Sequence, residues 1–214
     1  MYTAQLNFPD GKTRTIPLAV LPRDGAMEAR LAREQVPAGV ESIDFLPDYL
    51  TAKDGDDGYL VVPHGRNWTG SFLSRFKPRA DTEFISRGCV LPFFGCKRAD
   101  GCTLAVVNGM PHDFSTVASV KGGCYRIYAR YELEQDPPYE DLCITYYQLA
   151  DDQADYSGMA RFYRNLQLES GRCRTLRDRL NDVLDYATQS VEIRIRQGWK
   201  PVPPPVLEQT PETE

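Results

Sequence analysis

The chain has 214 residues, of which 42% are hydrophobic and 26% are charged, so its composition is close to the globular average and excludes a wholly disordered protein. The 25 lysines and arginines are outnumbered by 30 aspartates and glutamates, which gives a net charge of −5. Because such a chain repels polyanions at long range, we expect it to bind neither nucleic acid nor an anionic membrane. No apolar run approaches the ~20 residues that a membrane-spanning helix needs.

The first part of the chain is predicted to form a hairpin and a short helix. Apolar and polar residues alternate over 2–8, which is the period of a half-buried strand. The turn signal Asp10-Gly11 leads into a second strand over 13–21. Alanine and glutamate are dense over 26–36, which favours a short helix there.

The middle of the chain is predicted to consist of short strands. A turn over 54–58 precedes an apolar strand over 59–62, and the polar, basic stretch 64–82 is expected to be a long loop. Five further apolar runs follow, mostly separated by glycine or proline. They are 84–95, 102–107, 116–120, 125–131 and 142–149. Strands that recur about every ten residues predict a mainly β fold, either an antiparallel sandwich or a barrel.

Helical periodicity appears only after this strand-rich region. Apolar residues from Met159 to Leu168 fall at helical spacing, and Gly171 is well placed to end that helix. A second helix is predicted over 175–188, and the alternation over 191–196 predicts a final strand.

These patterns divide the chain into three expected parts. Residues 1–155 form a β-sandwich domain, and 156–200 form a helical connector with a closing strand. Residues 201–214 begin with a proline-rich run that must be extended, so they are expected to be a linker or a disordered tail.

Cysteine and histidine usage indicates neither a metal site nor a cofactor. The six cysteines lie mostly in apolar runs without any CxxC pair, which favours reduced, buried thiols. The histidines are His64 and His112, too few and too far apart for the usual zinc spacing. Glycine-rich phosphate loops are lacking as well, so we expect no metal and no cofactor.

One polar loop carries candidate sugar-binding residues. Arg66, Asn67 and Trp68 lie together in the stretch 64–82, close in sequence to Tyr59. An indole suits the apolar face of a pyranose ring, and neighbouring polar groups can bind its hydroxyls. The alternative is that Trp68 packs within its own domain.

Paired carboxylates are also present near the last strand of the predicted sandwich. Asp136, Glu140 and Asp141 could supply the acid and base of a glycosidase. The alternative is that this proline-rich loop is simply solvated.

Five segments in the second half of the chain occur in an order that resembles a known family. They are Pro138-Tyr139-Glu140-Asp141, the stretch from Asp155 to Arg164, the strand 190–196, Gly198-Trp199-Lys200-Pro201 and Glu208-Gln209-Thr210-Pro211. This order resembles the N-terminal β-sandwich region of large bacterial glycoside hydrolases, which precedes their (β/α)8 catalytic barrel. The resemblance covers roughly residues 85–214 and implies a mutarotase-like supersandwich.

The resemblance also implies roles for individual residues. Tyr156, Arg161, Tyr163 and Arg164 would lie on the helix that joins the sandwich to the barrel, and Trp199 near the start of the connection. The family's catalytic carboxylates would be expected on the barrel, so no catalytic residue is carried over to this chain. The implied partners are that barrel and a carbohydrate.

Three functional hypotheses follow. The first is a non-catalytic sandwich domain of a carbohydrate-active enzyme. The second is a stand-alone sugar epimerase or mutarotase-like enzyme, with His64 or His112 as acid and Glu140 as base. The third is a carbohydrate-binding module with Trp68 and Tyr59 as its platform. The first ten residues lack a basic and then apolar secretory pattern, so a cytoplasmic location is expected.

Overall fold

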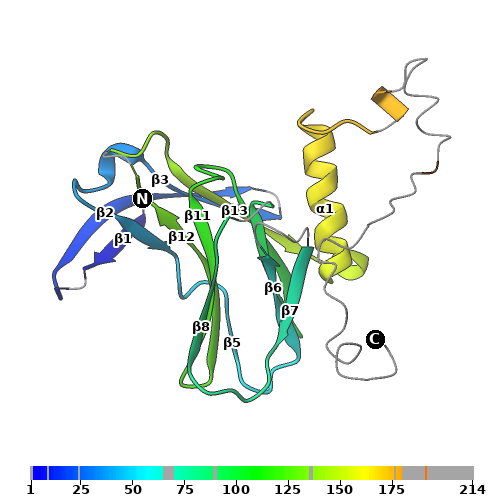
Figure 1. The fold of residues 1–214 in the computed structure, drawn as a ribbon, viewed down its shortest axis with the longest axis horizontal. Coiled ribbons are helices and arrows are strands. Elements are labelled where there is room, and N and C mark those ends of the chain that lie inside the picture. The colour runs from blue at the N-terminus through cyan, green and yellow to red at the C-terminus, as the bar shows by residue number, and fades with distance from the viewer. Residues whose placement is uncertain are drawn as a thin grey trace, which may run out of the picture. The chain divides into compact units, whose positions relative to one another are not determined.

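The computed structural model describes residues 2–8, 10–23, 25–64, 70–88, 91–134, 137–175, 177–179 and 191. Its strands form two antiparallel sheets, which are not closed into a barrel (Figure 1). The predicted mainly β, antiparallel sandwich is therefore confirmed.

The larger sheet has eight strands in the order β1-β2-β3-β13-β10-β9-β6-β7. Their bounds are β1 Tyr2–Asn7, β2 Thr13–Arg23, β3 Ala26–Leu31, β6 Gly58–His64, β7 Gly70–Arg75, β9 Phe93–Arg98, β10 Gly101–Val107 and β13 Leu142–Leu149. Strand β13, the last one that the structure describes, pairs with β3 on one side and with β10 on the other. It therefore joins the two halves of this sheet.

The smaller sheet has the order β4-β12-β11-β8, and β5 pairs with β12 beside β4. Its strands are β4 Ser42–Phe45, β5 Thr51–Lys53, β8 Thr82–Ser86, β11 Phe114–Lys121 and β12 Cys124–Glu132. Long β11 and β12 pair over eight residues and form the centre of the sheet.

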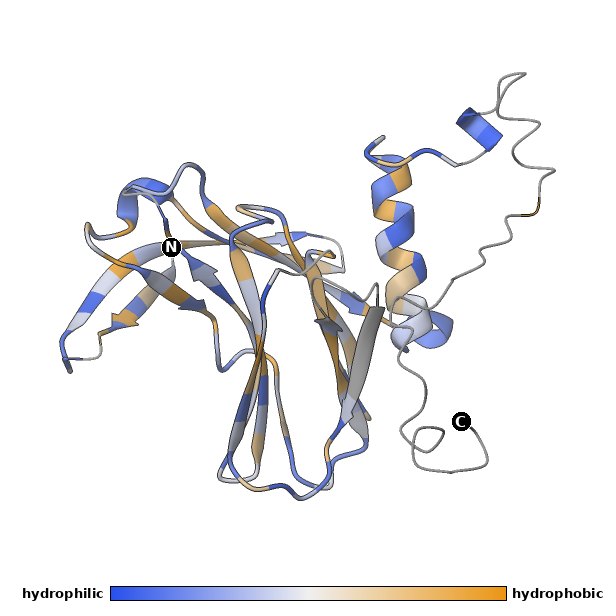
Figure 2. Cartoon of the chain, viewed as in Figure 1, coloured by the Kyte–Doolittle hydropathy of each residue, from blue (hydrophilic) through white to orange (hydrophobic). Residues whose placement is uncertain are grey.

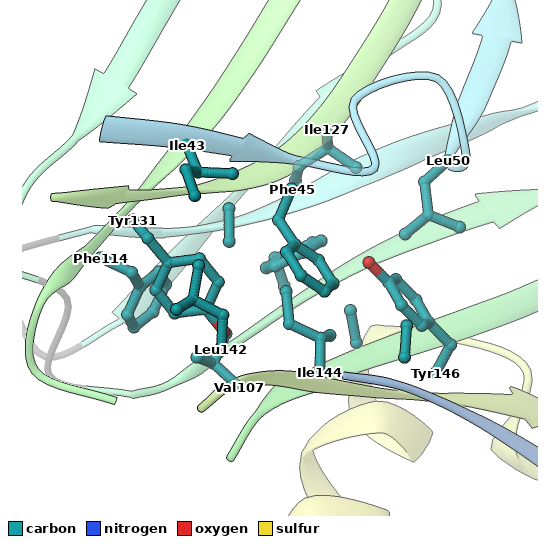
Figure 3. Close-up of a cluster of buried hydrophobic side chains, with 14 of the residues drawn as sticks. Ile43, Phe45, Leu50, Val107, Phe114, Ile127, Tyr131, Leu142, Ile144 and Tyr146 are labelled. Atoms are coloured by element: carbon teal, nitrogen blue, oxygen red, sulfur yellow. The ribbon is translucent and has the colours of Figure 1, made fainter. Parts of the chain in front are cut away.

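The main hydrophobic core lies between the two sheets (Figure 3). Ile43 and Phe45 of β4 alternate inward with exposed neighbours, and they meet Ile144 from the opposite sheet. Phe45 packs edge to face on Tyr131, with ring centroids 5.7 Å apart. The buried Tyr131 hydroxyl donates a hydrogen bond to the Cys143 carbonyl at 3.2 Å, so a polar contact also links the sheets.

A second hydrophobic cluster lies on the outer face of the larger sheet, beneath helix α1, Tyr156–Glu169. Met159 is fully buried there against side chains that include Val61, Phe93 and Leu104. Apolar and polar residues alternate around α1, as its mixed colouring in Figure 2 shows. The predicted helix is confirmed, and Gly171 with φ +70° lies just beyond its end.

One prediction near the amino terminus is wrong. Residues 26–36 do not form a helix but β3 followed by the short 3-10 helix η1, Arg33–Gln35. Ala29 and Leu31 face the core while Glu28 and Arg30 form ion pairs on the opposite face. Pairing with β2 and β13 on both edges outweighs the modest helix propensity of alanine and glutamate.

Two predictions in the middle of the chain also need correction. The stretch 64–82 is not all loop, because β7 pairs with β6 along the edge of the larger sheet. The run 84–95 is not one strand: its first residues belong to β8 and its last to β9, in different sheets. Gly88, with φ +64°, lies between them. The other strands predicted before residue 150 are present.

Most of the predicted carboxyl-terminal elements lie outside the described residues. Of the second helix over 175–188, the structure describes Thr175 and a 3-10 turn, η3 Arg177–Arg179. The strand over 191–196 is described only at Val191, and 201–214 not at all. The 3-10 turn η2, Asp151–Gln153, precedes α1.

The chain separates into two compact units, Met1–Leu166 and Gln167–Glu214. Among the described residues, no helix is long and apolar enough to cross a membrane.

Candidate functional site

The start of helix α1 is fixed by three local interactions. Asp155 precedes the helix, and its Oδ1 accepts the Gly158 N–H at 2.6 Å, which is an N-cap interaction. A side chain on Gly158 would lie 2.2 Å from the Gln153 carbonyl oxygen, so only glycine fits there. The next residue, Met159, then enters the sheet opposite Gly95, where an added Cβ would lie 2.4 Å from its sulfur. The Asp155-to-Met159 stretch thus encodes a tight joint between sheet and helix.

Tyr59 belongs to this same joint. It lies on β6, and its hydroxyl accepts the Tyr156 N–H at 3.1 Å. Its ring meets the Tyr156 ring edge to face at 6.4 Å, and the Arg75 guanidinium lies 6.0 Å from the ring centroid. Burial is the main cause that raises the pKa of Tyr59. The two aromatic rings are inclined to each other, so they do not form one flat surface for stacking.

Three of the four candidate sugar-binding residues, Arg66, Asn67 and Trp68, lie outside the described residues, as does Trp199 of the predicted interdomain set. A sugar-binding role for Tyr59 stays a prediction, and its observed contacts are with α1.

The remaining predicted interdomain residues divide between two faces of α1. Tyr163 is partly buried and packs on Phe93 at 4.8 Å between ring centroids, so it points toward the sheet. Tyr156, Arg161 and Arg164 are exposed. Arg161 Nη2 donates to the Asp152 carbonyl at 2.9 Å, which ties it to the turn before the helix. The two arginines therefore lie on the side of α1 away from the sheet, whereas Tyr156 is exposed at the edge of the packed face, beside Tyr59.

The described carboxylates of the predicted catalytic group bind the backbone. Glu140 Oε1 accepts the Met110 N–H at 2.5 Å, and Asp141 Oδ1 accepts the Arg33 N–H at 3.0 Å. Met110 is buried with φ +49°, a conformation that side-chain-bearing residues seldom adopt, so Glu140 helps to hold a strained turn. These contacts give both carboxylates a supporting role in the loops, while Asp136 lies outside the described residues.

A shallow, polar concavity of about 350 Å³ lies over these loops. Arg30 and Arg33 line it beside Glu140 and Asp141, and an Arg30 guanidinium nitrogen lies 3.6 Å from Asp141 Oδ2. Opposite charges are thus paired within its wall.

The described histidine and cysteine side chains do not add a cluster of metal ligands. His112 is exposed, and nothing is described of the His64 side chain. Burial raises the pKa of the thiols of Cys96, Cys102 and Cys143 to about 11, so they remain protonated at neutral pH. Within the described part of the chain, no three His, Cys, Asp or Glu side chains gather as metal ligands would.

A wider groove that the sequence did not indicate lies between the edge strands β1 and β4. It encloses about 590 Å³ and includes Asn7, Asp44 and Arg130 in its lining. Arg130 Nε and Nη2 donate to the two oxygens of Asp44 at 2.5 and 3.0 Å. The two residues are opposite one another on β12 and β4 but 86 positions apart in sequence, so no local motif links them.

Known proteins resemble this chain in structure and not detectably in sequence. No protein-family model matches it, and no curated protein matches its sequence. Among solved structures it is similar to the α-N-acetylgalactosaminidase NagBb of Bifidobacterium bifidum. The ligand-free enzyme has 15% identity and a TM-score of 0.60, and the GalNAc complex has 15% identity and a TM-score of 0.61.

Both comparisons cover 82% of this chain but only 31% of the enzyme. The chain therefore spans about a third of the length of the proteins it resembles, and at this identity the likeness shows the fold alone.

Proposed function

We propose that this chain is a non-catalytic β-sandwich domain of a glycoside hydrolase, and that it supports a (β/α)8 catalytic domain. The observation that carries the proposal is the fold match, which takes in most of this chain but less than a third of a glycoside hydrolase. The remaining two thirds of such an enzyme leave ample length for a separate catalytic domain.

The contacts of α1 support a connecting role. One face of the helix is anchored to the sandwich through Met159 and Tyr163, and the Asp155 cap fixes where it begins. Arg161 and Arg164 are exposed on the side away from the sheet, and Tyr156 is exposed at the start of the helix. We propose that these three side chains contact the catalytic domain, because aromatic residues and arginine are enriched at protein interfaces.

The bonding of the carboxylates favours this proposal over a mutarotase-like enzyme. A general base needs a carboxylate that can reach the substrate. One Glu140 oxygen already accepts a short hydrogen bond from the Met110 backbone, in a turn whose conformation depends on it.

Isolation from native cells tests the supporting role. We expect mass spectrometry to find peptides of this chain together with peptides of a glycoside hydrolase barrel, in one polypeptide or in a stable complex. Recovery of the chain from those cells without any barrel overturns the proposal.

Catalytic assays of the purified chain test the absence of activity. We expect no hydrolysis of a panel of nitrophenyl glycosides that includes the α-N-acetylgalactosaminide, and no acceleration of glucose or galactose mutarotation in a polarimeter. Robust turnover in either assay, lost in Glu140→Gln, would show that the chain is itself an enzyme.

A further inference from the structure

The groove between β1 and β4 has the chemistry of a ligand site. Its volume of about 590 Å³ lies within the range of roughly 300–1,000 Å³ for small-molecule pockets. Six polar side chains contribute to its lining. They are Gln5, Asn7, Glu41, Ser42, Asp44 and Arg130.

The Asp44–Arg130 pair keeps bonding capacity for a ligand. An ionised carboxylate offers about four acceptor positions. Two of these accept from Arg130. Of the five guanidinium N–H groups two bind Asp44, and the Nη1 nitrogen lies 3.7 Å from Glu83. The pair thus presents at least one acceptor and one donor side by side, on two neighbouring strands of one sheet.

The opposite wall supplies neutral amides. Gln5 and Asn7 are both exposed and lie two positions apart on β1, so they share one face of that strand, with their Cα atoms about 6.8 Å apart. Each amide can both donate and accept, as sugar hydroxyls also do.

Apolar surface lies between these polar groups. Phe8, Val40 and Pro47 also line the groove, and Phe8 is only half-buried. A pyranose has an apolar face of C–H groups beside its ring of hydroxyls, so it suits a lining of this mixed kind. The charged groups are two carboxylates and one arginine, which favours a neutral ligand over an anionic one.

We propose that the groove between β1 and β4 binds a neutral pyranose sugar, with Asp44, Arg130, Gln5 and Asn7 contacting its hydroxyls. This inference deepens the proposed function and rests on it for the choice of a carbohydrate. An extended peptide added to edge strand β1 is the competing occupant. Polar residues from two different sheets line the groove, which favours the sugar, because strand addition relies on backbone groups of one edge.

Backbone-amide NMR of the whole chain tests this proposal. Galactose, N-acetylgalactosamine, glucose, mannose and the oligosaccharides of a glycan array serve as probes. At least one of them should shift the amide resonances of 5–8 and 39–44 with a saturable dependence on concentration.

Substitutions then identify the contacts. Asn7→Ala removes an exposed side chain and should weaken binding by about fivefold to tenfold, the loss expected for one hydrogen bond. Asp44→Asn should weaken it further. The matched control is Asn165→Ala on the exposed face of α1, which should leave the affinity unchanged. Because Asn7 lies on an exposed edge, its variant stays informative if Asp44→Asn fails to fold.

Four outcomes overturn the groove proposal. They are no binding by any probe, shifts confined to other residues, an affinity unchanged in both Asn7→Ala and Asp44→Asn, and saturable binding of an extended peptide along β1 in place of any sugar. None of these affects the proposed supporting role, which needs no sugar in this groove. Conversely, the absence of a barrel partner overturns that role without changing the NMR result.

Discussion

At the scale of single residues, Gly95 and Met159 are in close contact where helix α1 meets the larger sheet. An alanine methyl at 95 would lie 2.4 Å from the buried methionine sulfur and 2.8 Å from its terminal carbon. Met159 is fully buried, so its side chain has little room to move. The absence of a Cβ at position 95 thus decides how closely α1 approaches the sheet.

We expect Gly95→Ala to lower the free energy of unfolding by about 1–3 kcal/mol, the usual cost of overpacking. In a Met159→Ala background the same change should cost almost nothing, since the opposing atoms are gone. Urea denaturation of the four proteins in this double-mutant cycle measures the difference. Gly101→Ala is the control, because no atom lies within 4 Å of its added methyl. Equal costs in both backgrounds would contradict the packing explanation.

At the scale of elements, helix α1 depends on its first turn. The Asp155 carboxylate satisfies the Gly158 N–H and also carries the charge that a helix amino terminus favours. We expect Asp155→Ala to destabilise the chain by about 1 kcal/mol. Asp155→Ser should retain most of the stability, because serine is also a good N-cap. Thermal unfolding checks both variants, and equal losses from alanine and serine would argue against a cap.

The same scale shows which elements could be predicted from sequence. Strands over 13–21, 102–107 and 142–149 were predictable because their apolar residues sit in runs or alternate, and α1 because Met159, Phe162 and Leu166 recur at helical spacing. The strand β3 was not, since its alanines and glutamate favour a helix locally and pairing with β2 and with the distant β13 makes them extended. Local propensity gives no account of partners more than a hundred residues away.

The contacts of the site residues also depend on segments that are distant in sequence. Glu140 was recognisable as a carboxylate in a loop, but its bond to the Met110 backbone depends on the packing of two turns. The groove pair Asp44 and Arg130 was invisible, because β4 is too short for a clear alternation and its partner strand lies far along the chain. The sequence shows which residues the loops contain, but it does not show which segments lie beside those loops in the fold.

At the scale of the whole molecule, buried thiols and phenols make the free energy of unfolding depend on pH in the alkaline range. Burial raises the pKa of Cys96, Cys102 and Cys143 from the ordinary value of 9.0 to about 11, and that of Tyr128 from 10.0 to about 12. Between its unfolded and its folded pKa, each of these groups releases its proton in the unfolded chain but retains it in the folded chain. The stabilisation is therefore complete below pH 9 and is lost as the pH rises toward 11.

We expect the free energy of unfolding to fall steadily over that interval, as measured by urea denaturation at a series of pH values. Cys96→Ala removes one titrating group, so its stability should decline less steeply than that of the parent chain. A free energy that stays constant or rises between pH 9 and 11 would contradict this account.

The central position of β13 has a consequence for biosynthesis. Until residues 142–149 leave the ribosome, β1 to β3 have no partner in the rest of the sheet, and β10 exposes an unpaired edge. While the residues between β3 and β13 are being made, the nascent chain therefore carries an open strand edge at β3, and once β10 has been made it carries a second one. Such edges invite pairing with other polypeptides. The pairing of β13 with both strands then joins the two halves of the sheet in one step.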